Sequence, residues 1–170
     1  MPRSTSQRMF AVEENVMGSG PRLGPTNPGS PAISASMEIV MTVSFLTTDK
    51  APPPFSNYSQ AVQIPAGARI VQVSGQVGVT LSGNLPSEPE QQHELAWRNV
   101  LAILDAANMD HNHITEVTAY VANHDQVAIY RDVRDRMLQG ARPASTLIVA
   151  GLANPDWKVE IAVTAASLDP

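Results

Sequence analysis

The chain has 170 residues, 43% of them hydrophobic, which is enough for one domain with a single core. Its net charge of -5 and aromatic content of 5% argue against sequence-independent nucleic-acid binding, which needs clustered Lys and Arg and stacking side chains. The absence of cysteine excludes disulfides, thiolate metal sites and cysteine nucleophiles. No apolar run is long enough to span a membrane, so we expect a cytoplasmic protein.

The first 40 residues differ in composition from the remainder. They are rich in Gly, Pro and Ser and lack apolar periodicity. A segment of this kind cannot bury enough apolar surface to offset its ordering entropy, unless it lies over a neighbouring subunit. We predict an N-terminal extension over residues 1–40 and one folded domain over residues 41–170.

Three strands are predicted before the first helix. Apolar and β-branched runs place them at residues 39–46, 58–62 and 69–74. Three consecutive prolines at 52–54 cannot join a strand ladder and predict an extended loop. The third strand is expected to stop at residues 75–78. Ser74 and Gly75 form either a bulge or turn with no further role, or a segment that presents backbone N–H groups to a ligand carboxylate or a developing negative charge.

Two amphipathic helices follow. Ser87 and Glu90 have the spacing of a capping box, with Pro89 in the first turn, and Asn108 is suited to end this helix in a left-handed conformation. After a strand over 114–121, Asp125 is expected to cap the second helix, which Gly140 ends. The predicted core stripe of the second helix is Ile129, Val133 and Met137, and its predicted solvated side is Arg131, Asp132, Arg134, Asp135 and Arg136.

The last two predicted strands flank an Asn-Pro-Asp turn at 154–156 and suggest a hairpin. In the second of them Val159, Ile161 and Val163 point one way. Glu160 points the other way, where a carboxylate is either solvated on an open sheet face or held in a pocket. The element order predicts an α+β fold with one sheet and both helices on one face. The other face is too apolar for open water, so we expect an oligomer.

Four segments, in this order, resemble the Rid family, whose members are also described as RidA, YjgF or L-PSP endoribonuclease-like. The resemblance covers residues 41–170, and its segments are Tyr58-Ser59-Gln60-Ala61, Val73-Ser74-Gly75-Gln76-Val77-Gly78, Ile103-Leu104-Asp105-Ala106-Ala107 and Val159-Glu160-Ile161. It implies a chorismate-mutase-like α+β domain, a mixed sheet with two helices on one face, in a homotrimer with ligand clefts between subunits. Typical members hydrolyse reactive imines or enamines to 2-oxo acids and ammonia without a metal or bound cofactor.

The resemblance also assigns roles to residues. The glutamate that activates water falls on Glu160, which is the implied catalytic residue. The arginine that grips the substrate carboxylate is replaced by Ala144, so Arg142, at the strand entry, and Arg131, on the second helix, are candidate replacements. The full set of implied substrate-binding residues is Tyr58, Ser74, Gly75, Ala144, Ser145, Arg142 and Arg131.

Three functions are compatible with the sequence. The first is a Rid-type hydrolase of imines, enamines or a related small C–N metabolite. The second is a non-catalytic trimer that binds a small carboxylate or metabolite in the same clefts. The third is a ribonuclease or translation inhibitor, which the acidic charge and sparse aromatic residues disfavour. We expect no nucleic-acid or membrane partner. A metal site is not expected, because His111 and His113 lie in a loop without a third ligand nearby.

Overall fold

The computed structural model describes residues 42–169, and the predicted extension over 1–40 lies outside them. The elements run β1 (Ser44–Leu46), β2 (Ala61–Gln63), β3 (Arg69–Val77), α1 (Pro89–Asp105), η1 (His111–His113), β4 (Ile114–Val121), α2 (Gln126–Leu138), β5 (Ala144–Val149) and β6 (Val159–Ser167). The predicted order of strands and helices is confirmed. Within the described residues no helix is both long and apolar enough to cross a membrane.

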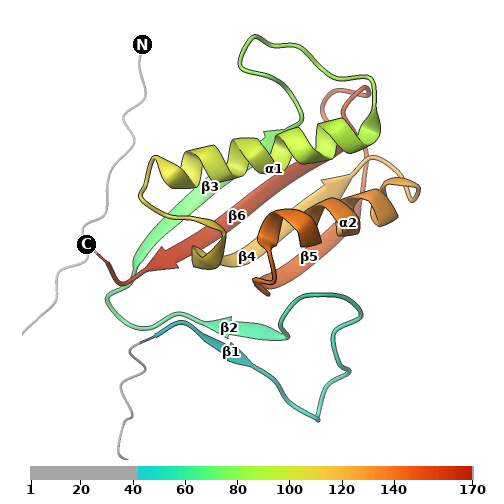
Figure 1. Ribbon diagram of the computed structural model, residues 1–170. Helices are drawn as coiled ribbons and strands as arrows, with labels where there is room; N and C mark the ends of the chain where they lie inside the picture. The colour runs from blue at the N-terminus through green and yellow to red at the C-terminus, as the bar shows by residue number, and fades with distance from the viewer. Residues whose placement is uncertain (1–41, 170) are drawn as a thin grey trace, which may run out of the picture. The chain divides into compact units, whose positions relative to one another are not determined.

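The main sheet has four strands in the order β3-β6-β4-β5, with β4 and β5 parallel and the other pairs antiparallel. Both helices cover the same face of this sheet (Figure 1). The predicted α+β class, the mixed sheet and the one-sided helices are therefore confirmed. We call the other face of this sheet, which neither α1 nor α2 covers, the open face (Figure 1).

Two topological expectations are wrong. β1 and β2 form a separate two-stranded sheet, because β2 is only three residues long and the turn after Pro65 separates it from β3. β5 and β6 do not form a hairpin, because β4 lies between them. The crossover through α2 makes β5 a parallel neighbour of β4 instead.

α1 begins later than the capping-box pattern predicted. Its N-cap is Glu88, in an extended conformation, with no side-chain cap hydrogen bond. Proline disfavours the helical conformation in the residue before it, so Pro89 fixes the boundary itself and Ser87 is left outside. The expected left-handed residue after this helix is confirmed, since Asn108 has a φ of 53°.

α2 begins and ends close to the predicted residues, but the residue at its start does not make the expected capping contact. Asp125 is the N-cap without a side-chain cap bond, and its own N–H donates to the Asn123 side chain at 3.1 Å. The helix ends at Leu138, after which Gln139 and Gly140 have φ values of 50° and 97°. Both are left-handed conformations that stop a helix.

The core lies between the helices and the covered face of the sheet. Its largest fully buried side chains include Trp97, Tyr130, Leu104, Leu138 and Ile161. A fully buried histidine, His93 of α1, bonds through Nε2 to the Gln126 side-chain oxygen of α2 at 3.1 Å. Burial lowers the pKa of His93, with the Gln126 bond opposing, so this side chain is neutral in the folded protein.

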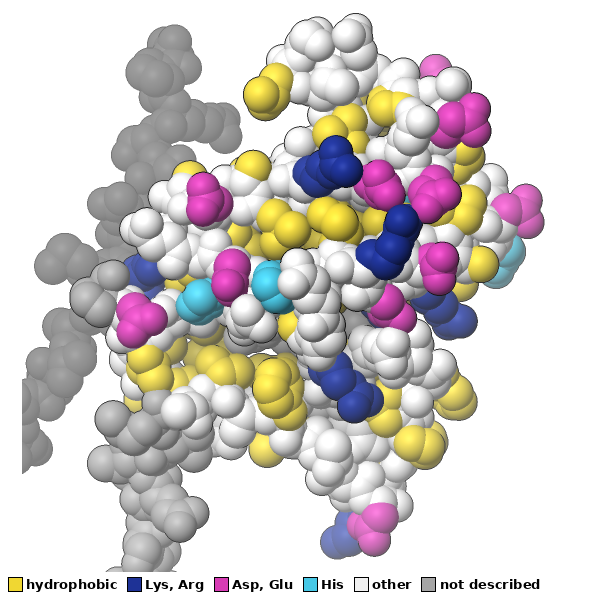
Figure 2. All heavy atoms as spheres, viewed as in Figure 1, with side chains coloured by type: hydrophobic (Ala, Val, Ile, Leu, Met, Phe, Trp, Pro, Cys, Tyr) yellow, Lys and Arg dark blue, Asp and Glu magenta, His cyan; other side chains and the backbone are white. Residues whose placement is uncertain are grey.

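The outer surfaces of the helices carry charges of both signs (Figure 2). Arg136 of α2 pairs with Glu90 at 2.6 Å and with Glu94 at 3.2 Å, which links α2 to α1. These pairs are largely solvent-exposed, so each contributes little to stability.

Candidate functional site

Glu160 lies on the open face of β6. Its neighbours Val159 and Ile161 are completely buried against the helices, whereas Glu160 is half-buried on the opposite side. It pairs with Val77 on β3 and with Tyr120 on β4. The predicted alternation of this strand is therefore confirmed, and Glu160 has an aromatic neighbour on the same face that the sequence analysis did not identify.

The Ser74–Gly75 segment lies within reach of this carboxylate. β3 does not stop at Gly75, as the sequence analysis expected, but continues to Val77 through a bulge in which Ser74 and Gly75 together oppose Ala162. A bulge adds a residue without ending the strand, so the expected strand end is wrong, and of the two alternatives for Ser74 and Gly75 the structure has the bulge.

Gly75 gives the Glu160 side chain the space in which it lies. A methyl group at Gly75 would overlap the Glu160 carboxylate, with the carboxyl carbon only 2.8 Å away. The carboxylate therefore rests over the bare Cα of Gly75. Strand register and a missing side chain fix its position together, without an ion pair to Glu160 among the described residues.

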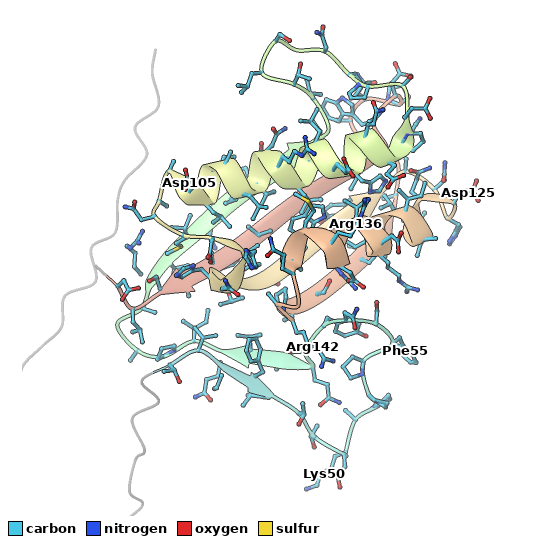
Figure 3. All side chains as sticks on the ribbon, in the orientation of Figure 1. Lys50, Phe55, Asp105, Asp125, Arg136 and Arg142 are labelled. Carbon is cyan, nitrogen blue, oxygen red and sulfur yellow. The ribbon has the colours of Figure 1, made fainter. Side chains whose placement is uncertain are left out.

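Tyr58 and Arg142 line a separate open groove of about 640 Å³. The groove is lined by Phe45, Thr47, Pro54, Tyr58, Ser59, Asn112, Gln139, Gly140, Ala141 and Arg142. The Tyr58 hydroxyl accepts a bond from the Phe55 N–H at 3.1 Å. Figure 3 shows Arg142 between the end of α2 and the β1–β2 sheet, with Phe55 on the adjoining loop. The Arg142 side chain is exposed and makes no ion pair or hydrogen bond to another described residue.

The proline-rich loop that carries Tyr58 is attached to β5 and α2. The Ser59 hydroxyl donates to the Arg142 carbonyl at 2.6 Å, and the Ser59 N–H donates to the Pro143 carbonyl at 3.2 Å. From α2, Arg134 donates to the Ser56 hydroxyl at 3.0 Å and Asp135 accepts from the Asn57 amide at 2.6 Å.

Arg134 was expected on a solvated helix face, and this is wrong. It is only 3% exposed, forms an ion pair with Asp135 at 2.7 Å and lies over the Tyr130 ring at 5.9 Å. The true buried stripe of α2 is Gln126, Tyr130, Val133, Arg134 and Leu138. An arginine on this stripe can be buried because its guanidinium donates to Ser56 of the loop and to Asp135 of the same helix.

Ala144 and Ser145 begin β5 and point to opposite faces. Ala144 lies on the open face, where it pairs with Glu116 and bridges to Ser59. Ser145 faces the helices, where its hydroxyl and the Arg134 cation oppose the burial that raises the pKa of Tyr130 to about 12. Arg131 lies on the exposed side of α2, in the helical layer and not on the open face.

One chain does not bring Glu160 and Ala144 together. Glu160 shares its row across the sheet with Tyr120 and Ile148, whereas Ala144 is four residues further back along β5. Four residues of strand span about 13 Å. The sequence-predicted residues therefore fall into two main groups: a carboxylate end (Ser74, Gly75 and Glu160) and a groove (Tyr58 and Arg142). Ala144 does not line the groove but bridges to Ser59, which does, whereas Ser145 and Arg131 belong to the helical side and to neither group.

The histidine pair at 111 and 113 has a structural role. The two residues lie in η1, where Asp110 accepts from the Asn112 N–H at 2.9 Å and the His113 ring caps the Asp110 N–H at 3.0 Å. Across residues 42–169 no cluster of three or more His, Cys, Asp or Glu side chains has a metal-binding arrangement.

The fold and the open-face carboxylate define a class: an α+β domain in which both described helices lie on one face of the sheet and a carboxylate stands on the other (Figure 1). A sequence model of the family described as Endoribonuclease L-PSP matches residues 48–167, so the chain belongs to this family. It is 30% identical to the mouse protein named 2-iminobutanoate/2-iminopropanoate deaminase over 118 residues, covering 68% of this chain and 85% of that protein.

Solved structures agree with this assignment. The Rid-family protein YyfB from Yersinia pestis has a TM-score of 0.67 and 25% identity, covering 75% of this chain and all of that one. TdcF from E. coli, solved with bound serine, has a TM-score of 0.55 and 25% identity, covering 73% of this chain and 98% of that one. The RidA/YjgF/L-PSP resemblance identified from the sequence is thus confirmed.

Proposed function

We propose that the protein hydrolyses small reactive imines or enamines, or a related C–N metabolite, with Glu160 as the catalytic residue. The observation that carries this proposal is the carboxylate of Glu160, held over Gly75 on the open face without an ion pair to another described residue. The printed activity of the mouse relative supports the substrate class.

The reaction requires one water and a relay of protons. Glu160 accepts a proton as the water oxygen adds to the imine carbon, and the C=N double bond becomes a single bond. The nitrogen takes this proton from Glu160, which gives a neutral carbinolamine. Glu160 then accepts the proton of the new hydroxyl and passes it to the nitrogen, the C=O double bond forms as the C–N bond breaks, and ammonia and a 2-oxo acid leave. A positioned general base of this kind contributes roughly 10²- to 10⁴-fold to the rate.

We propose that the complete site forms between subunits of a homotrimer. Along the strands of one chain, the row of Glu160 and the row of Ala144 lie about 13 Å apart, and Ala144 bridges to Ser59 of the groove. A second copy on the open face would place its groove against the first chain's Glu160. Light scattering should give about 55 kDa, three times 18.2 kDa, and a monomer would contradict this arrangement.

The activity is tested by a coupled assay. A dehydratase generates 2-aminoacrylate, and formation of the 2-oxo acid is followed with the protein added at micromolar concentration. We expect acceleration by the wild type and its loss in Glu160→Gln. Glu116→Gln is the matched control, because Glu116 is a carboxylate on the same face in the row of Ala144. No acceleration by the wild type would refute imine hydrolysis.

The second candidate is a non-catalytic trimer that binds a small carboxylate. It is favoured by Arg142, an exposed guanidinium that lines the groove and makes no ion pair with another described residue. In this case the wild type would bind a 2-oxo acid but leave the rate of imine breakdown unchanged. A ribonuclease is disfavoured by the net charge of -5, and tight RNA binding that persists at moderate salt would contradict that argument.

A further inference from the structure

Tyr120 is the aromatic residue that strand pairing places beside the proposed catalytic carboxylate. It sits directly opposite Glu160 in the antiparallel β4–β6 pair, so both side chains stand on the open face. Directly opposed residues of such a pair have Cβ atoms about 5 Å apart. Both side chains are half-buried, which leaves part of each accessible to a ligand.

The three tyrosines of the chain are used differently. Tyr58 accepts a main-chain hydrogen bond from Phe55, and Tyr130 is completely buried with its pKa raised to about 12. The Tyr120 side chain makes no hydrogen bond to any other residue within 42–169, although it stands on the open face. Its hydroxyl is therefore the aromatic donor that is free for a ligand next to Glu160.

A neutral hydrogen-bond donor such as the Tyr120 hydroxyl suits a site that already contains the negative charge of Glu160. Any ligand that carries a carboxylate is repelled by Glu160, and Ala144 does not supply the cation that would offset this. Lys158 precedes β6 by one residue but forms no ion pair with Glu160. A neutral phenol can donate to a ligand oxygen while adding no charge beside the proposed general base.

We propose that Tyr120 is a further substrate-contacting residue that determines specificity. Its hydroxyl donates a hydrogen bond to an oxygen of the ligand, and its ring forms the β4 wall against the planar C=N group. The ligand class is a planar unsaturated C–N compound with an oxygen acceptor close to the reacting carbon. This inference rests on the proposed function, because it uses the same carboxylate.

The test uses the full-length protein and 2-oxobutanoate as the probe, which is the 2-oxo acid expected from 2-iminobutanoate. Affinity is measured by titration calorimetry and kcat/KM by the coupled assay. Tyr120→Phe keeps the ring and removes the hydroxyl, so we expect about a three- to tenfold loss in affinity and in kcat/KM. Tyr120→Ala also removes the ring and should lose more.

Thr164→Val is the matched control, since it deletes a hydroxyl on the same face, in the Glu116 row, four residues from Glu160. It should leave both readouts unchanged, and the thermal unfolding of Tyr120→Phe should match the wild type. Weaker probe binding in Tyr120→Phe without imine hydrolysis by the wild type would remove the proposed function but keep Tyr120 as a ligand contact. Unchanged affinity and kcat/KM in Tyr120→Phe would overturn the inference, and so would a wild type that neither binds the probe nor hydrolyses the imine.

Discussion

The carboxylate end and the groove are built in different ways. At the carboxylate end, main-chain pairing of β6 with β3 and β4 fixes Glu160, and the bare Cα of Gly75 gives its carboxylate room. At the groove, a proline-rich loop holds Tyr58, and side-chain bonds from Arg134 and Asp135 attach that loop to α2.

Because they are built differently, the carboxylate end and the groove should respond differently to amino-acid substitutions. A side chain that is fixed by strand register, such as Glu160, changes position only when a substitution adds or removes atoms directly beside it. A site on a loop depends on a few hydrogen bonds, so the loss of one polar partner should loosen it. The predictions below separate these two kinds of construction.

The largest expected effect is that of Gly75→Ala at the carboxylate end. The added methyl group displaces the flexible end of Glu160 and no main-chain atom, so the fold should persist. We expect about a hundredfold loss in kcat, as for a small misplacement of a catalytic group. The combination with Glu160→Gln should lose little more than Glu160→Gln alone, because both changes disable the same carboxylate.

Gly78→Ala is the matched control for this variant. A methyl group there overlaps the main chain of Gln92 in α1, which cannot move as a side chain can. Gly78→Ala should lower the urea midpoint, whereas Gly75→Ala should not. Equal destabilisation by the two variants would mean that Gly75 serves packing and not the position of Glu160.

At the groove, Arg134→Leu should destabilise the fold and loosen the Tyr58 loop. The change leaves Ser56 and Asp135 without their buried donor, which should cost about 2 kcal/mol. Arg136→Leu on the same helix is the control, since its side chain is 52% exposed and its ion pairs contribute roughly 0–1 kcal/mol. Urea unfolding checks both, and similar losses in the two variants would contradict a special role for Arg134.

Arg142→Ala tests whether this exposed arginine serves the ligand. We expect about a tenfold rise in KM with little change in kcat, because the guanidinium would bind substrate and transition state alike. Arg131→Ala, which removes an exposed arginine from the helical layer, is its control and should leave KM unchanged. If instead Arg131→Ala raises KM and Arg142→Ala does not, the groove is not the ligand site.

The smallest expected effect is that of pH on the stability of the fold, through the buried side chain of His93. The pKa of His93 is lowered by burial, so the unfolded chain takes up a proton near pH 6.5 while the folded protein resists it. The stability that neutral His93 contributes is present above pH 6.5 and is lost as the pH falls below it. Between pH 7.5 and 5.5 the free energy of unfolding should fall by about 1 kcal/mol.

His93→Gln checks the origin of this slope. The variant should be less stable than the wild type at both pH values, because a buried ring is lost. It should also lose the part of the pH dependence that His93 contributes. A slope that is the same in wild type and variant would assign the effect to other groups.

Features that depend on the local sequence pattern, such as the bounds of strands and helices, could be predicted from the sequence. The bounds of β4, the alternation around Glu160 and the two helices follow from periodicity and from residues such as Pro89. The pairing of β5 with β4, and of Tyr120 with Glu160, depends on non-local contacts that no local pattern contains. Tyr120 did alternate onto the exposed side of its predicted strand, which was the available signal.

The burial of Arg134 and the continuation of β3 past Gly75 could not be predicted, for physical reasons. Charged residues on a helix are usually solvated, and only the bonds to Ser56 and Asp135 make burial of Arg134 tolerable. A glycine within a strand pattern signals either an end or a bulge, and only the pairing of β3 with β6 on both sides of Gly75 distinguishes the two.

The central claim, that one chain supplies Glu160 and another supplies the groove, is tested most directly with mixed oligomers. Glu160→Gln chains are combined with Ala144→Glu chains, in which a carboxylate faces the proposed cleft. Each variant alone should be inactive, whereas oligomers shown by native mass spectrometry to contain both should regain imine hydrolysis, because some clefts receive both intact halves. Mixed oligomers that remain inactive would contradict the shared site.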